Sequence, residues 1–346
     1  MHGYTPPHFH APHAGPAGLA HGEPYPRSGA PQTIFIPFFF HMWFKNLTVY
    51  RLPADWSVSA ASLEEGLARR PLQPCSPLEM RRTGWVPPAT TDRLLHSVGE
   101  QHLVALGVDQ KLLPGSIVRQ EAQQRARLKA QTQGFPVGRR QMRELKMQVL
   151  DELRARALTR RRVTRAWIDP RNGWLVVDSG SDGRAEELVE ALRDTLGSLA
   201  VAKVETERSP SACMATWLMQ SDATGPFSIE QDLELQSGEP AKSIVRYRRH
   251  PLDGKEVRAY VAGGKRPTQL GLTWNGRVSF VLTEKLQIKK VEFLEVAPER
   301  GDEEEIDAAE QFDLDFAVMA GELAKLLEEL IRELDGRQTA GRAAAA

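Results

Sequence analysis

Arginine and lysine form two dense groups, and these are the residues whose type and spacing most clearly suggest chemistry. The segment from Ser116 to Arg165 has fourteen Lys or Arg against four Asp or Glu, a net charge of +10. A second group lies in Ile244–Arg266, where seven cations are interleaved with Tyr247 and Tyr260. Dense cations suit backbone phosphates, and aromatic rings can stack on bases or sugars. These groups favour nucleic-acid binding, with solvated basic helix faces as the alternative.

Acidic residues gather at the other end of the chain. The segment Glu299–Asp335 holds fourteen Asp or Glu against three Lys or Arg, a net charge of −11. The whole chain has 45 cations and 45 anions, so its zero net charge conceals this asymmetry. Such asymmetry predicts one part that faces a polyanion and a separate, solvating part.

Residues for catalysis or metal binding do not form a pattern in this sequence. It has no Walker A motif, G-x-G-x-x-G loop, G-x-S-x-G elbow or HExxH, and we predict no cofactor or metal. Absence of these motifs does not exclude an enzyme, since a site can assemble from residues far apart in the sequence. The spacing of His8, His10 and His13 could hold a metal, but they lie in a Pro-rich segment without apolar periodicity. We interpret "GSDG" at 180–183 as a turn and helix N-cap. A nuclease would need carboxylates converging near the basic surface, and the sequence offers no candidate.

The ends of the chain and its cysteines define its organisation. We expect residues 1–41 to be a disordered extension, with Met42 as the biological start, and residues 337–346 to be a disordered tail. The apolar run "IFIPFFF" at 34–40 is too short for a membrane, and no run of about 18 apolar residues exists. Cys75 and Cys213 make neither a metal pattern nor a disulfide framework, which favours a reducing, cytosolic setting.

The remaining periodicity predicts an α+β fold with mixed sheets. Two basic helices, Ser116–Ala130 and Gly138–Leu158, are broken at "QGFPVG" and form a helical hairpin. The segment 165–203 reads as a β-hairpin around "DPRNG", a helix and a third strand. The same patterns predict strands in "WFKNLTVYRL", "HLVALGVDQK", "TQLGLTW", "RVSFVLT" and "IKKVEFLEV". They predict helices in "SAASLEEGLARRPL" and "GELAKLLEELIREL".

The last of these helices has a continuous apolar stripe. Leucine or isoleucine recurs from Leu323 to Leu334 at i, i+3, i+4, i+7, i+8 and i+11. This stripe predicts either packing in the chain's own core or docking of a partner protein. The second possibility defines a competing function, an interaction module in which contact with DNA is incidental.

An ordered set of segments then resembles the bacterial RdgC family of recombination-associated proteins. They are "MWFKNLTVYRL", "PLQPC", "EMRRTGWVPP", "LLPGSIVRQ", "WIDPRNGWLVVD", "LRDTLGSL", "LTWNGRVSFVL" and "QFDLDFAVMAGELAKLLEELI". Together they span nearly all of residues 42–336. No single segment is a catalytic motif, but the ordered set is specific.

The resemblance implies a protein that is not an enzyme. It implies a ring-shaped homodimer with a positively lined hole that binds double-stranded DNA, and single-stranded DNA more weakly, with little sequence preference. It also implies restraint of the RecA recombinase and a cytoplasmic, nucleoid-associated location. Leu158 lies where the family has an exposed apolar interface residue, with an ordinary helix-packing leucine as the alternative. "RYRRHPL" at 246–252 is similar to the family's basic finger in charge character only.

We therefore expect a region 42–336 with sub-regions of roughly 42–115, 116–165 (the hairpin), 166–242, 243–268 (the basic finger) and 269–336. The expected DNA contacts are Arg139, Arg140, Arg143, Lys146, Arg154, Arg156 and Arg160 on the hairpin, and Arg246, Arg248 and Arg249 on the finger. Leu158 is the expected dimer contact.

Overall fold

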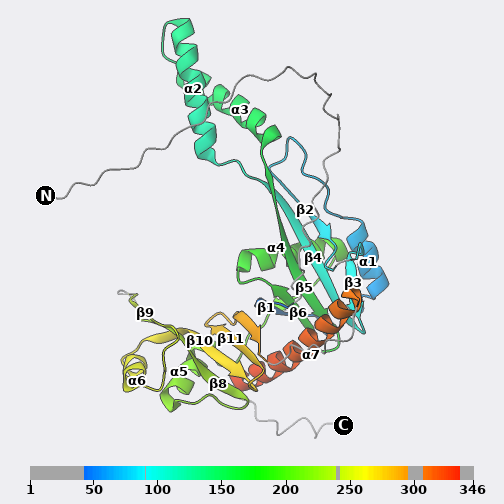
Figure 1. Cartoon of the computed structure of the whole chain (residues 1–346), viewed down its shortest axis with the longest axis vertical. Helices are drawn as coiled ribbons and strands as arrows, with labels where there is room; N and C mark the ends of the chain where they lie inside the picture. Colours follow the sequence, from blue (N-terminus) through cyan, green and yellow to red (C-terminus); the bar gives the residue numbers. More distant parts are fainter. Residues whose placement is uncertain (1–42, 90, 239–241, 295–306, 336–346) are drawn as a thin grey trace, which may run out of the picture. The chain divides into compact units, whose positions relative to one another are not determined.

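The computed structural model describes residues 43–89, 91–238, 242–294 and 307–335 (Figure 1). The expected N-terminal extension with its histidines, the expected start at Met42, the C-terminal tail and residues 299–306 of the acidic segment lie outside these residues. The helices are α1 (Ala60–Ala68), α2 (Gly115–Gln133), α3 (Arg139–Arg156), α4 (Asp182–Leu196), α5 (Pro210–Gln220), α6 (Lys255–Ala262) and α7 (Ala308–Asp335). The strands are β1 (Asn46–Arg51), β2 (Arg81–Val86), β3 (Leu95–Val98), β4 (Gln101–Lys111), β5 (Thr159–Asp169), β6 (Trp174–Asp178), β7 (Ala202–Lys203), β8 (Phe227–Gln236), β9 (Ile244–Tyr247), β10 (Arg266–Trp274), β11 (Val278–Thr283) and β12 (Ile288–Phe293).

The strands join in one hydrogen-bonded sheet in the order β2-β4-β5-β6-β1-β12-β11-β10-β8-β9, with β3 on β4 and β7 on β1. The predicted α+β class is confirmed. The prediction of mixed sheets is wrong for the described strands, because every pairing between them is antiparallel and the only parallel contact is a bridge from Pro71 to Trp85. Hairpin connections such as β5–β6 and β10–β11 require antiparallel neighbours. Two Cα pairs join β1 to β12, so the contact between the two halves of the sheet is narrow.

The first half of the sheet is buried on both faces. Leu47 and Val49 of β1 belong to one hydrophobic cluster, whereas Tyr50 of β1 and Leu52, which follows the strand, belong to the other. Alternate residues of a strand point to opposite faces, so both sets of side chains are buried at once. The first cluster contains the α7 side chains and the second contains those of α1 and α4. This two-sided burial explains why β4 and β6 are nearly continuous apolar runs in the sequence.

Helix α7 supplies its apolar stripe to the core. Leu323, Leu326, Leu330 and Leu334 are 0% exposed, and Leu327 is 1% exposed. Fully burying one such side chain stabilises a fold by about 1.5–3 kcal/mol. The core alternative for this stripe is therefore confirmed, and docking of a partner on these leucines is wrong.

The segment 165–203 follows the predicted order of elements. The turn between β5 and β6 has Gly173 at φ +71°, and the Asp169 carboxylate accepts hydrogen bonds from the backbone and side chain of Asn172 at 3.1 and 2.7 Å. Helix α4 ends at Gly197, whose φ of +76° is left-handed, as expected for a glycine C-cap. The predicted N-cap Ser181 makes no capping side-chain bond. Its backbone N–H instead donates to Ser179 Oγ at 3.1 Å.

The structure has two elements, α5 and β8, between residues 206 and 243, where the sequence pattern predicts none. Ser209 Oγ accepts a hydrogen bond from the Ala212 N–H at 3.2 Å, and Pro210 occupies the first turn of α5. These are helix-start signals that local inspection could have used. Strand β8 has irregular register against β10, which obscures its alternation in the sequence.

Candidate nucleic-acid interface

The helical hairpin of α2 and α3 is predicted correctly, and a glycine turn shapes it. Gly134 closes α2 at φ +80°, and its N–H donates to the Ala130 carbonyl at 2.9 Å. This left-handed conformation favours glycine because it has no Cβ. Helix α3 then begins after Gly138, whose N–H donates to Gln141 Oε1 at 3.2 Å. Figure 1 shows the two helices connected to the ends of β4 and β5.

The hairpin has a small hydrophobic core of its own. Only Val118, Ala122 and Val149 form its buried cluster, with a few half-buried apolar residues packed against them. Arg125 adds a charged link between the helices, since its guanidinium binds Glu121 at 2.9 Å and Glu152 at 2.8 Å. The hydrogen bond from Arg125 lowers the pKa of the Glu152 carboxyl. The hairpin thus exposes most of its surface.

Three of the predicted cations line one groove at the start of α3. Arg139, Arg143 and Lys146 stand at i, i+4 and i+7 and therefore share a helix face. Val137 and Met142 complete the lining of this groove of about 420 Å³. Among the described residues, none forms an ion pair with these three cations. The cation groove, as we call Val137, Arg139, Met142, Arg143 and Lys146, therefore has three uncompensated positive charges.

Other predicted DNA contacts have partners within the chain. Arg140 lies 3.2 Å from Glu144, and both side chains are exposed. Arg154 pairs with Asp151 and donates to the Leu78 carbonyl at 2.7 Å, so its side chain is only 20% exposed. This half-buried guanidinium holds the loop before β2. Arg156 is exposed at the end of α3.

The basic hairpin predicted over 116–165 extends too far, because α3 ends at Arg156 and β5 begins at Thr159. Arg160 therefore lies on a strand and not on the helical hairpin, although it is exposed. Arg161 stands opposite Asp109 across β4 and β5, and binds its carboxylate through two hydrogen bonds of 2.8 and 2.9 Å. Hydrogen bonding from Arg161 lowers the pKa of Asp109. Arg162 pairs with Glu187 of α4 at 2.7 Å. The net charge of +10 thus overstates the charge that the hairpin presents.

The predicted basic finger consists of β9, a bend and α6. Arg246 on β9 stands opposite Glu234 on β8 and pairs with it at 2.6 Å. Arg248 and Arg249 are exposed in the bend, where Asp232 Oδ1 accepts the Arg249 N–H at 3.3 Å. Arg249 has a left-handed φ of +51°. All three predicted finger contacts are exposed, but Arg246 is paired with Glu234, whereas Arg248 and Arg249 have no ion pair with a described residue.

Leu158 lies in an exposed apolar group at the base of the hairpin. It is 78% exposed, so the alternative of an ordinary helix-packing leucine is wrong. The Leu158 carbonyl accepts the N–H of Leu112, which is 52% exposed. The nearby Leu78 is 76% exposed, although Lys111 and Arg154 hold its loop through backbone carbonyls. Leu78 and Leu112 were not predicted, because only the fold joins Leu112 to Leu158 and holds the Leu78 loop against Arg154 at the end of α3.

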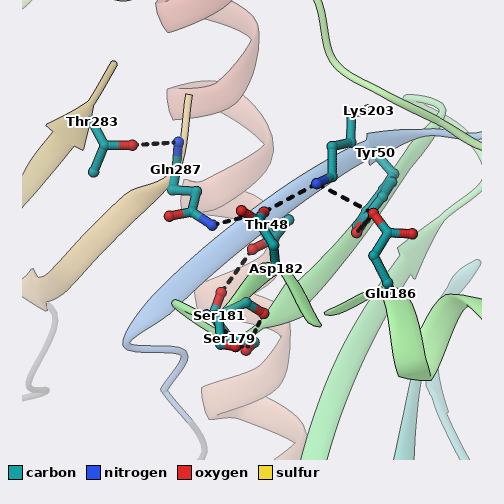
Figure 2. Close-up of polar contacts among 9 residues, drawn as sticks. All are labelled: Thr48, Tyr50, Ser179, Ser181, Asp182, Glu186, Lys203, Thr283 and Gln287. Carbon is teal, nitrogen blue, oxygen red and sulfur yellow. Dashed lines mark hydrogen bonds and ion pairs between the residues drawn. The ribbon is translucent and has the colours of Figure 1, made fainter. Parts of the chain in front are cut away.

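Figure 2 shows a polar cluster that joins β1, α4, β7 and the turn before β12. Lys203 Nζ lies 3.0 Å from Asp182 Oδ1 and 3.2 Å from Glu186 Oε1. Burial disfavours the charge on Lys203, but its hydrogen bonds to the two carboxylates outweigh this effect and raise its pKa. Tyr50 donates to Glu186 at 3.1 Å and Gln287 donates to Asp182 at 3.0 Å. This carboxylate pair escaped the sequence analysis, and Lys203 neutralises much of its charge.

Burial raises the pKa of the Tyr50 hydroxyl, and the neighbouring Glu186 carboxylate raises it further. Thr48 donates to the Ser179 carbonyl at 2.7 Å, which fixes β1 against the end of β6 (Figure 2). The contact from Gln287 to Asp182 spans the two halves of the sheet. The cluster therefore reinforces their narrow β1–β12 connection.

No group of three or more His, Cys, Asp or Glu in the described part of the chain is placed to hold a metal ion. None of the helices described here is both long enough and apolar enough to cross a membrane.

The fold and the cation groove define an α+β protein with a helical hairpin whose charge is complementary to a polyanion. Residues 42–337 match the family model described as "Putative exonuclease, RdgC". The Recombination-associated protein RdgC of Dechloromonas aromatica (strain RCB) is 45% identical over 298 residues, which are 85% of this chain and 98% of the relative. The protein of the same name from Cupriavidus pinatubonensis (strain JMP 134 / LMG 1197) is 46% identical over 299 residues, 86% of this chain and 100% of the relative.

The chain belongs to the RdgC family. Its family model carries the word exonuclease, whereas these two relatives are named for recombination and not for an enzymatic activity. The resemblance found in the sequence is thereby confirmed.

Proposed function

We propose that this protein takes part in recombination by binding DNA without sequence preference, mainly as duplex, and that it restrains the RecA recombinase. The main support for DNA binding is the cation groove, in which Arg139, Arg143 and Lys146 lie on one helix face without ion-pair partners among the described residues. The names of the relatives support the link to recombination. Arg156, Arg160, Arg248 and Arg249 are exposed and extend the basic surface. Competition for the same DNA would limit loading of the recombinase.

The cation spacing supports phosphate binding and not base readout. Arg139 and Lys146 are seven residues apart, about 10 Å along a helix axis. Phosphates of one strand are about 3.4 Å apart along a duplex axis, so this span covers roughly three of them. Phosphate contacts position a protein on DNA but carry no sequence information. We propose no catalytic step, and we place the protein in the cytoplasm at the nucleoid.

The salt dependence of binding to random duplex tests this function. Each phosphate neutralised contributes about −0.9 to the slope of log K against log salt. Reversing all three groove cations, Arg139→Glu, Arg143→Glu and Lys146→Glu, should flatten the slope by about 2.7. A control variant reverses two cations outside the groove, Lys325 and Arg332, which lie on α7 beside acids. A flat line for the unmodified protein, or strong preference for one sequence, would contradict the proposal.

We also propose a ring-shaped homodimer in which Leu158 contributes to one contact. A two-subunit ring closes at two contacts, each isologous about the dyad. The exposed Leu78, Leu112 and Leu158 support one such contact, since apolar area in water favours association.

The mass of the protein in solution tests this dimer contact. Leu158→Asp should shift the protein towards monomer in analytical ultracentrifugation. Leu314→Asp, at an exposed position of α7, should not do so. Unchanged dimer mass for Leu158→Asp excludes this contact.

A further inference from the structure

The cation groove has an apolar part that binding to duplex phosphates leaves unexplained. Val137 and Met142 line it together with the three cations, and both side chains are half-buried. Met142 also packs against the hairpin's buried cluster, so only part of its side chain is available to a ligand. Phe135 lies two residues before Val137 in the turn and is 59% exposed. Phosphate oxygens favour polar and charged donors, so an apolar lining adds nothing to their recognition.

An unpaired nucleotide offers both chemistries at once. Its phosphate is anionic, and its base has an apolar face that becomes accessible only when it leaves the stack. Sites for unpaired nucleic acid combine a positive groove with apolar or aromatic surfaces that receive the bases. The groove has a volume of about 420 Å³, and cations lie on the same helix face as Met142. The hairpin turn therefore combines the parts of such a site within twelve residues, from Phe135 to Lys146.

We infer that the cation groove receives one unstacked nucleotide, with its base against Val137, Met142 and Phe135 and its flanking phosphates on Arg139, Arg143 and Lys146. This inference rests on the proposed DNA binding and specifies which form of DNA the site prefers. An uninterrupted duplex uses only the cations. A duplex with an unpaired base uses the apolar lining as well.

The test compares two short duplexes with identical ends, one uninterrupted and one with a single unpaired adenine at its centre. The duplex with the unpaired base should bind about tenfold more tightly at the same salt concentration. A third duplex, with an abasic site in place of the unpaired adenine, should lose this gain because it keeps the phosphate but has no base. A fluorescent adenine analogue at the unpaired position should change its emission on binding.

Two variants test whether the tighter binding of the duplex with an unpaired base depends on the cation groove. Met142→Gln keeps good helix propensity, and Phe135→Ala changes an exposed turn residue outside the hairpin's buried cluster. Each should lower the ratio of the two affinities towards one. Phe135→Ala should also leave binding to uninterrupted duplex within about twofold, because all five groove residues remain. Leu128→Gln, at an exposed position of α2 that does not line the groove, is the control and should keep the ratio.

The outcomes separate this inference from the proposed function. Salt-dependent binding to both duplexes with equal affinity overturns the unpaired-nucleotide site and leaves DNA binding intact. A gain that persists in both Met142→Gln and Phe135→Ala overturns its assignment to the groove. If the abasic duplex also binds more tightly than the uninterrupted duplex, the protein recognises DNA flexibility, and the proposed contact with the base is wrong. Absence of salt-dependent binding to either duplex contradicts the proposed function itself.

Discussion

Helix α7 and the α2–α3 hairpin are the two longest helical parts of the described chain, and they use their side chains in opposite ways. Ten residues of α7 are buried, whereas α2 and α3 bury four between them. The hairpin instead exposes large apolar side chains and uncompensated cations. Helices gain most of their stability from packing an amphipathic face, so α7 should dominate folding. The hairpin should contribute mainly to binding.

The sharpest test of this contrast compares two leucines. Leu327 is 1% exposed in α7, so Leu327→Ala should leave a cavity and lower the free energy of unfolding by about 2–5 kcal/mol. Leu128 is 58% exposed in α2, and Leu128→Ala should change it by no more than about 0.5 kcal/mol. Urea unfolding followed by circular dichroism measures both. Similar losses for the two variants would refute the division of roles.

The second test asks whether exposed cations outside the hairpin also bind DNA. Arg248→Glu with Arg249→Glu should weaken binding to all duplexes about equally and flatten the salt slope by about 1.8, since two phosphate contacts are lost. Reversing Lys325 and Arg332 of α7 provides a control of equal charge change. If the Arg248 and Arg249 variant alters only sequence preference, the phosphate role is wrong.

A smaller effect concerns cations that are paired and not free. Arg161→Ala should remove both donors from the Asp109 carboxylate, which is 4% exposed, and lower the free energy of unfolding at pH 7 by about 1–3 kcal/mol. Arg69→Ala removes an exposed pair with Glu65 and should cost no more than about 1 kcal/mol. Urea unfolding of the two variants beside the parent protein measures the difference.

The Arg161 effect should also depend on pH. Hydrogen bonding from Arg161 holds the pKa of Asp109 below its usual value, so folding favours the ionised carboxyl. This stability is present above the unfolded pKa of about 3.9 and is lost as pH falls through the lower folded pKa. The difference between parent and Arg161→Ala should therefore shrink on acidification. A constant difference from pH 7 to strongly acidic pH would contradict the assignment.

The smallest expected effect is on the internal motion of the hairpin. Arg125→Gln removes the link from α2 to Glu152 of α3, and amide hydrogen exchange in both helices should become faster. Arg127→Gln changes an exposed cation of the same helix that has no ion pair with a described residue, and exchange should stay as in the parent. Equal amide exchange rates in the two variants would show that the Arg125–Glu152 ion pair does not restrain the hairpin.

Local sequence patterns predicted the hairpin, the β5–β6 turn and the α7 stripe well, because each depends on residues close together in the chain. Gly134, Gly173 and Gly197 mark ends and turns that need a left-handed backbone. Residues 206–243 were left unassigned, since strand β8 is stabilised by its irregular pairing with β10 and not by a clear alternation of its own. The predicted mixed sheets failed because pairing direction depends on the connections between strands.

The sequence by itself determined the family, the helical hairpin and the excess of cations around it. Only the tertiary structure decided which cations remain available, because strand register places Arg161 opposite Asp109 and Arg246 opposite Glu234. Folding also joined Leu112 to Leu158, held the Leu78 loop against Arg154 and buried the α7 leucines. Charge pairing and burial depend on neighbours far apart in the chain, so the fold was needed to show that the three groove cations have no ion-pair partner among the described residues.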